Sequence, residues 1–344
     1  MSNFSQKLIA WQKENGRNDL PWQVRDPYVR WLSEVMLQQT QVATVLGYFD
    51  RFIKRFPSVE SLACASEDEV MTYWAGLGYY TRARNLHRCA KEVVQRYQGK
   101  FPRTRQELES LPGIGRSTAA AIAAFGFGEK ETILDGNVKR VLTRFLAIEG
   151  APNRADVTKR LWEQAEMLLP DDEIESYIQG LMDLGALVCT RTPKCLHCPV
   201  VSECLAHRDG REMDLPTPNP KKSRPEKTRT FLLLWNGERI WLERRCQKGV
   251  WQGLFSLPEI DGELDEEQAE MQARDLGFEV RNSRRMETIV HDFSHYRLHI
   301  NPIAIAIKKA PTLDDDHRFV EASSLGEIGL PAPIEVLLSK FFSV

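Results

Sequence analysis

The segment from Leu111 to Arg140, LPGIGRSTAAAIAAFGFGEKETILDGNVKR, constrains the fold more than any other part of the chain. Its Pro112, Gly113 and Gly115 predict a tight turn, because glycine accepts a positive φ at little cost. The residues at 116–127 are mostly Ala, Ile and Phe, and they predict a closely packed helix. The start of a helix offers free N–H groups to a phosphate oxygen. The segment therefore predicts an anion-binding turn.

Asp135 lies at the mouth of a second predicted helix, in which apolar residues from Val138 to Phe145 recur at helical spacing. An Asp in this position is commonly an ordinary N-cap. It can also present a carboxylate to whatever binds at the preceding turn. The residues alone allow both roles at once.

One continuous helix is predicted from Pro27 to Leu46, and apolar residues surround it. Glu34 and Gln39 stand out because they are polar within this buried pattern. A buried Glu is costly unless it is paired or its pKa is raised. Glu34 therefore either pairs with a nearby Arg or is a protonated acid suited to general-acid catalysis.

A glycine-framed corner, GLGYYTRARN at residues 76–85, joins two further predicted helices. Its tandem Tyr79 and Tyr80 can insert an aromatic ring between DNA bases while Arg82 and Arg84 approach phosphate. The same residues can equally pack two helices against each other.

Four of the seven cysteines fall within sixteen residues, in the pattern Cys189-x5-Cys195-x2-Cys198-x5-Cys204. A disulfide framework would be spread through a short secreted chain. A cluster of thiols in a long chain instead indicates a metal site, either zinc or an iron–sulfur cluster. The spacing does not choose between these metals.

The period of the apolar residues changes from helical to alternating near residue 229, after a proline-rich stretch. We therefore expect an all-α domain at 1–205, a linker at 206–228 and an α+β domain at 229–344. Helices are predicted at 4–14, 48–56, 66–75, 83–97, 156–169, 173–188, 265–276 and 334–342. Strands are predicted in a hairpin at 230–245, around Asn236-Gly237, and at 287–293 and 296–307. His291, His295 and His299 share a strand face, where polar contacts are expected more than a metal.

Charge permits a nucleic-acid partner without demanding one. The net charge of the chain is −2, yet residues 1–228 carry 32 Lys and Arg against 29 Asp and Glu. No apolar run is long enough to span a bilayer, and the first residues lack a signal-peptide core. We expect a cytoplasmic protein with no membrane contact.

Several segments, in their order along the chain, together resemble the MutY family of adenine DNA glycosylases. They are RWLSEVMLQQTQV, GLGYYTRARNLH, LPGIGRSTAAAI, ILDGNVKRVL, MDLGALVCTR and the four-cysteine cluster. This family is part of the helix-hairpin-helix DNA glycosylase superfamily, which includes endonuclease III. The resemblance spans the whole chain and is strongest over residues 20–205. It implies a multi-domain fold, in which an all-α glycosylase domain with an iron–sulfur cluster precedes a Nudix-like domain similar to MutT.

The resemblance implies a monomeric repair enzyme that removes adenine mispaired with 8-oxoguanine or guanine in double-stranded DNA. By position, Glu34 would be the acid, Asp135 the carboxylate that stabilises the sugar, and Asn137 the residue that orients Asp135. The implied DNA contacts are made by Gln39, Tyr79, Arg82, Leu111, Gly113, Gly115, Ser117, Phe293, Ser294 and His295, the last three of which would read 8-oxoguanine. Cys189, Cys195, Cys198 and Cys204 would hold a [4Fe–4S] cluster.

Three departures from the family pattern refine these expectations. The first cysteine spacing has five intervening residues where the family has six, so the loop is shorter. The predicted helix DEEQAEMQARDLG lacks the Nudix REXXEE pattern, and we expect no pyrophosphatase activity. Ser117 replaces the lysine nucleophile of bifunctional relatives, so strand cleavage should be weak or absent. The alternatives are an endonuclease III-like lyase for oxidised pyrimidines and a catalytically silent DNA-binding module.

Overall fold

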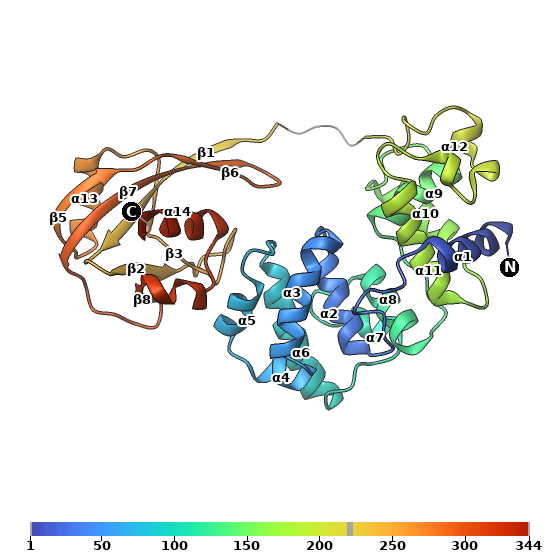
Figure 1. Ribbon diagram of the computed structural model, residues 1–344, viewed down its shortest axis with the longest axis horizontal. Coiled ribbons are helices and arrows are strands. Elements are labelled where there is room, and N and C mark those ends of the chain that lie inside the picture. The colour runs from blue at the N-terminus through green and yellow to red at the C-terminus, as the bar shows by residue number, and fades with distance from the viewer. Residues whose placement is uncertain (1, 219–222, 343–344) are drawn as a thin grey trace. The chain divides into compact units, whose positions relative to one another are not determined.

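The computed structural model describes residues 2–218 and 223–342, which fall into two units (Figure 1). The first unit holds the described residues up to Cys64 and those from Asn85 to 218. The second holds residues 65–84 together with those from 223 onward. Parts of the predicted linker 206–228 and of the predicted domain 229–344 lie outside the described residues.

Helices build the first unit, which confirms the all-α prediction. They are α1 (Asn3–Asn15), α2 (Pro27–Leu37), α3 (Val42–Arg55), α4 (Val59–Cys64), most of α6 (Thr81–Tyr97), α7 (Arg105–Glu109), α8 (Arg116–Phe127), α9 (Gly136–Phe145), α10 (Ala155–Met167), α11 (Ile174–Asp183) and α12 (Leu205–Arg208). A π-helix, η1 (Leu184–Val188), continues α11, and two 3-10 turns, η2 (Cys195–His197) and η3 (Val201–Glu203), lie among the cysteines. Within the described ranges, no helix is both long and apolar enough to cross a bilayer.

Helix α8 packs closely against α2 because its residues are small. A Cβ atom added to Gly126 would lie only 3.2 Å from Cα of Pro27. Asp26 caps α2 by accepting hydrogen bonds from the N–H groups of Tyr28 at 2.8 Å and Val29 at 3.3 Å. Pro27 at the first helical position needs no N–H partner. Together these contacts fix α2 against the helix that follows the glycine turn.

The predicted single helix from Pro27 to Leu46 is wrong. Helix α2 ends at Leu37 and α3 begins at Val42, and between them Gln39 adopts the left-handed conformation with φ 57°. Residues 38–41, between the two helices, include no Gly or Pro that would have signalled this break. As a result Gln39 is exposed instead of buried in an apolar stripe.

The second unit contains a mixed eight-stranded sheet, which confirms the expected α+β Nudix-like fold. Its strands are β1 (Glu226–Trp235), β2 (Arg239–Arg244), β3 (Phe255–Ser256), β4 (Glu259–Asp261), β5 (Glu279–Arg285), β6 (Ile289–Asp292), β7 (Arg297–Lys309) and β8 (His317–Glu321). Strands β1 and β2 form the predicted hairpin, and β1 runs parallel to β7 in the order β3-β2-β1-β7-β5.

Helix α13 (Glu266–Asp275) packs its buried Ala269 and Ala273 against the apolar side chains of this sheet. The 3-10 segment η4 (Ala322–Glu327) and helix α14 (Ala332–Phe342) complete the C-terminal part. Helix α5 (Glu67–Trp74) and the corner that follows it also group with this unit by their contacts, although they lie within the domain predicted at 1–205.

Candidate functional site

The glycine turn between α7 and α8 has the predicted form. Gly113 has φ 75°, and a Cβ atom there would lie 2.7 Å from Cβ of Asn85, so glycine is required on two grounds. Leu111 is buried and its carbonyl accepts a hydrogen bond from Ile114 N–H at 3.2 Å. Gly115 is exposed, and a Cβ there would meet no atom within 4 Å. Because Gly115 has no side chain to cap α8, the start of this helix is open to an external acceptor.

Asp135 is the N-cap of α9, as one interpretation of the sequence predicted. Its Oδ1 accepts a hydrogen bond from Val138 N–H at 2.7 Å, and its Oδ2 accepts one from Asn137 Nδ2 at 3.3 Å. Burial raises the pKa of the Asp135 carboxyl, while the two hydrogen bonds and the charge of Arg140 oppose that rise. Capping uses only part of the carboxylate, so it does not exclude a second role.

The Glu34 carboxyl is half-buried on α2, and the charge of Arg30 acts on it without a direct ion pair. No described residue donates a hydrogen bond to it or forms an ion pair with it. The guanidinium of Arg30 instead donates from Nε to the carbonyl of Val24 at 2.9 Å and lies 4.4 Å from the ring of Phe125. Burial raises the pKa of Glu34 to about 7. The positive charge of Arg30 opposes this rise, and the charge of Asp135 adds to it. The charge of Asp135 therefore acts on Glu34, so the two predicted carboxyls are electrostatically coupled.

Asn137 connects Asp135 to Arg140, a residue that the sequence analysis missed. Arg140 donates to Asn137 Oδ1 at 2.9 Å and to the carbonyls of Gly185 and Cys189, each at 2.7 Å. A Cβ on Gly185 would lie 2.6 Å from Cβ of Asn137, so the π-helix η1 approaches α9 closely at this point. The arrangement holds the Asn137 amide in an orientation in which it donates to the carboxylate.

Ser117 lies one residue into α8, and its hydroxyl oxygen accepts a hydrogen bond from Leu134 N–H at 3.1 Å. Leu134 immediately precedes Asp135 in the chain. Ser117 therefore ties the start of α8 to the segment that presents the carboxylate. It contributes a hydroxyl at the place where a lysine would contribute an amine.

Tyr79 and Gln39 share an uncommon geometry for residues other than glycine. Tyr79 has φ 49° and its side chain is 47% exposed, and Gln39 is also exposed at positive φ. Around Tyr79, the indole of Trp74 donates to the carbonyl of Gly78 at 3.1 Å. The structure thus presents both of these implied DNA-contact residues to solvent on strained backbone.

The structure does not support the phosphate contact predicted for Arg82. Arg82 is buried and donates to the carbonyls of Leu77 and Gly78, both at 3.1 Å. Its guanidinium also lies 5.5 Å from the ring centre of Tyr79, and burial lowers its pKa to about 10. Arg82 therefore supports the corner from inside, and the sequence could not reveal this because an Arg beside two Tyr is usually exposed.

The four clustered cysteines line one small pocket with apolar walls that include Val141, Leu184 and Val200. None of the four forms a disulfide, and burial raises the pKa of the Cys198 thiol to about 12. Arg144 donates to Cys189 Sγ at 3.4 Å and to the carbonyl of Thr190 at 2.6 Å. The sequence did not single out Arg144, which lies one helical turn after Arg140. Four sulfur donors around one apolar pocket fit either a tetrahedral metal or an iron–sulfur cluster.

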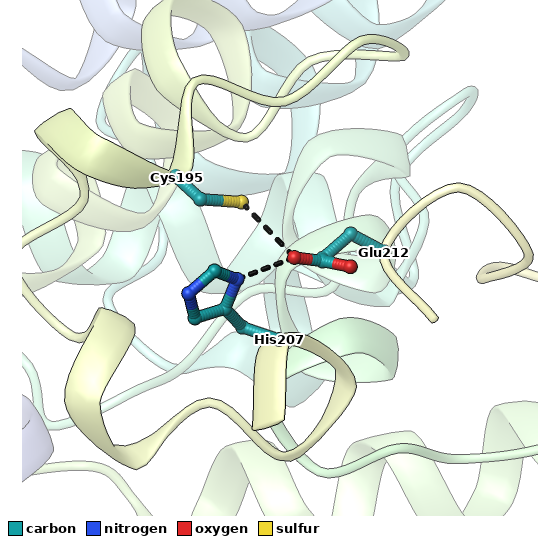
Figure 2. A group of neighbouring side chains, drawn as sticks. All are labelled: Cys195, His207 and Glu212. Atoms are coloured by element: carbon teal, nitrogen blue, oxygen red, sulfur yellow. Dashed lines mark hydrogen bonds and ion pairs between the residues drawn. The ribbon is translucent and has the colours of Figure 1, made fainter. Parts of the chain in front are cut away.

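Cys195 also belongs to a second potential ligand set with His207 and Glu212 (Figure 2). One ligand atom from each of these residues lies within 4.8 Å of the others, and Cys195 Sγ is 3.9 Å from Glu212 Oε1. His207 Nδ1 is hydrogen-bonded to the same carboxylate. The cysteine pocket therefore has a Cys-His-Glu group at its rim.

Phe293, Ser294 and His295 form the turn between β6 and β7. Phe293 N–H donates to the carbonyl of Tyr296 at 2.9 Å, and the ring of Phe293 lies 5.1 Å from that of Trp251. Ser294 and His295 are exposed at the tip.

The three spaced histidines do not gather around one point, although the rings of His291 and His295 lie 4.6 Å and 6.1 Å from that of Phe293. His299 bonds to Glu226 at 2.8 Å, whereas the ring of His291 lies 5.6 Å from that of Trp251. The described residues bring no metal-ligand group together around them.

Known proteins match both parts of this chain. Residues 32–167 match the family model of the HhH-GPD superfamily base excision DNA repair proteins, and residues 230–340 match a NUDIX domain. The adenine DNA glycosylase of Buchnera aphidicola subsp. Acyrthosiphon pisum is 36% identical over 343 residues, covering 98% of this chain and 97% of that protein. The chain belongs to the adenine DNA glycosylase family.

Solved structures resemble part of this chain. A thermostable thymine-DNA glycosylase is 31% identical, with a TM-score of 0.55 over 60% of this chain and 95% of that one. A non-covalent complex of endonuclease III with DNA is 21% identical, with a TM-score of 0.52 over 60% of this chain and 94% of that one, and it supports the fold alone. The adenine DNA glycosylase family places this chain among the enzymes of base excision DNA repair.

Proposed function

We propose that this enzyme hydrolyses the N-glycosidic bond of adenine in double-stranded DNA where adenine lies opposite 8-oxoguanine or guanine. The observation that carries the proposal is the contrast between two coupled carboxyls. Glu34 has no hydrogen-bond partner among the described residues and its pKa is raised to about 7, whereas Asp135 accepts two hydrogen bonds. An acid and an anion in contrasting surroundings are what cleavage of a glycosidic bond requires.

In the proposed reaction, the bond between the sugar carbon and the base nitrogen breaks and its electron pair leaves with adenine. Glu34 donates its proton to the base and so makes it a better leaving group. Asp135 stabilises the positive charge that develops on the sugar, with Asn137 holding its orientation. Water then adds to the sugar carbon, and its proton passes to a carboxylate of the site.

Adenine must leave the base stack to reach these groups. Gln39 and Tyr79, which are exposed at positive φ, suit insertion into the gap that remains in the duplex. The open start of α8, from Leu111 to Ser117, would hold the DNA backbone. The turn of Phe293, Ser294 and His295 would read 8-oxoguanine. Given its burial, we propose no phosphate contact for Arg82.

We infer that the enzyme is monofunctional and acts as a monomer. Ser117 has no amine with which to form a Schiff base, and its oxygen is occupied by Leu134 N–H. The expected product is therefore an intact strand with an abasic site. Strand breaks that appear without heat or alkali would favour the alternative of a lyase.

For the cofactor, we propose a [4Fe–4S] cluster on Cys189, Cys195, Cys198 and Cys204, which would fix the fold of this loop. The second candidate is a zinc site on Cys195, His207 and Glu212, because their ligand atoms lie within 4.8 Å of one another. Iron and sulfide analysis of anaerobically purified protein separates them. Stoichiometric zinc in place of iron would overturn the cluster, and loss of that zinc in His207→Ala would assign it to Cys195, His207 and Glu212. Iron and sulfide retained in His207→Ala would support the cluster.

The function is tested with duplexes that carry adenine opposite 8-oxoguanine, guanine or thymine, and with thymine opposite guanine. We expect adenine release from the first two duplexes, fastest opposite 8-oxoguanine. Thymine release is the second candidate activity, because a thymine-DNA glycosylase is 31% identical to this chain. Release of thymine alone, release of adenine only opposite thymine, or no release at all would refute the proposal.

A further inference from the structure

Helix α5 is a part of the glycosylase sequence that packs with the C-terminal domain. Residues 65–84 lie within the 32–167 match to the HhH-GPD family, yet their contacts group them with the residues that match the NUDIX domain. The C-terminal unit thus holds both Tyr79 and the turn at 293–295. The side chains of α5 that contact the C-terminal domain account for this grouping.

Asp68, on the first turn of α5, forms ion pairs with Arg244 and Arg318. Both of its carboxylate oxygens accept hydrogen bonds from Arg244 at the end of β2, and Oδ2 lies 2.9 Å from Arg244 Nη2. Arg318 on β8 donates to Asp68 Oδ2 at 2.9 Å. Two parallel hydrogen bonds between a guanidinium and a carboxylate fix both distance and orientation. The hydrogen bond from Arg244 holds the pKa of Asp68 below its usual range.

The two arginines are themselves held in place. Their guanidinium groups lie 4.5 Å and 4.4 Å from the ring centre of Phe255, and Arg244 Nε also donates to Asp316 at 3.1 Å. Each arginine is therefore supported by an aromatic ring before Asp68 approaches. Ion pairs of this kind lose less side-chain entropy than pairs of unsupported surface residues.

Backbone contacts extend the same interface along α5. Thr72 donates to the carbonyl of Glu327 at 3.2 Å, and Arg84 donates to the carbonyl of Gln252. A Cβ on Gly329 would lie 3.2 Å from the carbonyl carbon of Met71, so the chain passes directly against the helix. Both ends of the segment 65–84 are thus attached to the C-terminal domain.

Hydrogen bonds in the corner that follows α5 connect this helix to Tyr79. Trp74, the last residue of α5, donates from its indole to the carbonyl of Gly78, and Arg82 donates to the same carbonyl, both at 3.1 Å. Tyr79 is the next residue, and its positive φ leaves its backbone little freedom. A shift of α5 would therefore move Tyr79.

We propose that Asp68, through Arg244 and Arg318, is a positioning residue that docks the Tyr79 corner onto the Nudix-like domain. Base readout by the turn at 293–295 and insertion of Tyr79 then act as one rigid unit. This inference deepens the proposed function and rests on it.

Hydrogen exchange in the full-length protein without DNA tests the docking itself. Asp68→Ala should accelerate amide exchange in residues 67–80 and in the facing segments around Arg244 and Glu327, by roughly tenfold. Glu263→Ala is the matched control, because Glu263 bonds to Arg285 at 2.6 Å elsewhere in the same unit. Asp68→Glu keeps the charge and should restore part of the protection. Unchanged exchange in Asp68→Ala would overturn the docking.

The effect on specificity is tested by a double-mutant cycle with Tyr79. The readout is the ratio of single-turnover rates for adenine opposite 8-oxoguanine and opposite guanine. Asp68→Ala should lower this ratio about tenfold in the otherwise unmutated enzyme. In the Tyr79→Ala variant, adding Asp68→Ala should leave the ratio unchanged. Additive losses in the double variant, or an unchanged ratio in Asp68→Ala, would overturn the positioning role. Failure of the unmutated enzyme to release adenine would instead refute the proposed function, while the exchange result would still decide the docking.

Discussion

The surroundings of Glu34 on α2 differ from those of Asp135 at the start of α9, although the two carboxyls influence each other. Asp135 accepts hydrogen bonds from a backbone N–H and from Asn137, whereas no described residue bonds to Glu34. Burial raises the pKa of both groups, but only Asp135 has donors that oppose the rise. Hydrogen-bond donors therefore decide which carboxyl is suited to be the anion and which the acid.

Removing the acid should have the largest effect on catalysis. Glu34→Gln cannot protonate the leaving base, so the single-turnover rate of adenine release should fall by about 10²–10⁴. The matched control is Glu163→Gln, an exposed residue on α10 that should leave the rate unchanged. Retention of more than a tenth of the rate in Glu34→Gln would assign the acid to another group.

Neutralising Asp135 should have the next largest effect on the rate. Asp135→Asn keeps an N-cap side chain but removes the charge, so the rate should fall by about 10²–10³ while duplex binding and the melting temperature are retained. Asp26→Asn is the matched control, because Asp26 caps α2 with hydrogen bonds of the same kind. Loss of folding in Asp135→Asn alone would show that capping is the main role of Asp135.

The Glu34 carboxyl, which has no hydrogen-bond donor, should also destabilise the folded protein at alkaline pH. Because the pKa of Glu34 is raised to about 7, its contribution to stability is complete below the unfolded-state value of 4.5 and is lost as pH rises through 7. The change in the free energy of unfolding caused by Glu34→Gln should therefore be about 3 kcal/mol more stabilising at pH 8 than at pH 4. Thermal unfolding of the variant and of Glu163→Gln at both pH values measures this. Equal effects of Glu34→Gln at the two pH values would contradict the raised pKa.

The pH dependence of the rate provides a milder test of the same contrast. Only protonated Glu34 can donate, so the single-turnover rate should fall about tenfold per pH unit as the pH rises above 7. Binding of a duplex that cannot be cleaved should show no such break. A rate that rises with pH across 7 would assign Glu34 the role of a base.

Much of this site could be predicted because its residues lie on short contiguous stretches with their own physical signals. The helix predicted at 116–127 coincides with α8, and Asp135 is the predicted cap of α9. The Asn236-Gly237 hairpin also forms as its turn residues indicate. In each case the period of apolar side chains, the cap or the turn residue acts over fewer than fifteen positions.

What the sequence could not reveal depends on contacts between distant residues. Gln39 breaks the predicted helix with no local signal, next to a contact between Gln38 and Thr118 at 3.3 Å. The burial of Arg82 and the attachment of α5 to Arg244 likewise require the folded chain. The short strands β3, β4 and β8 and the largely polar strand β5 were missed, because neighbouring strands and not their own apolar pattern define them.

The smallest expected effect concerns the link between the glycine turn and the anion. Ser117→Ala removes the acceptor for Leu134 N–H, whose distance to Ser117 Oγ is 3.1 Å, and should destabilise the protein by about 1 kcal/mol. Because Leu134 precedes Asp135, the rate should fall only severalfold, and Glu34 should keep its pH profile. Thr118→Ala, one residue further along α8, is the matched control. If Ser117→Ala lowered the rate as much as Asp135→Asn, the hydroxyl would take part in the reaction itself, and the contrast between the two carboxyls would no longer account for catalysis.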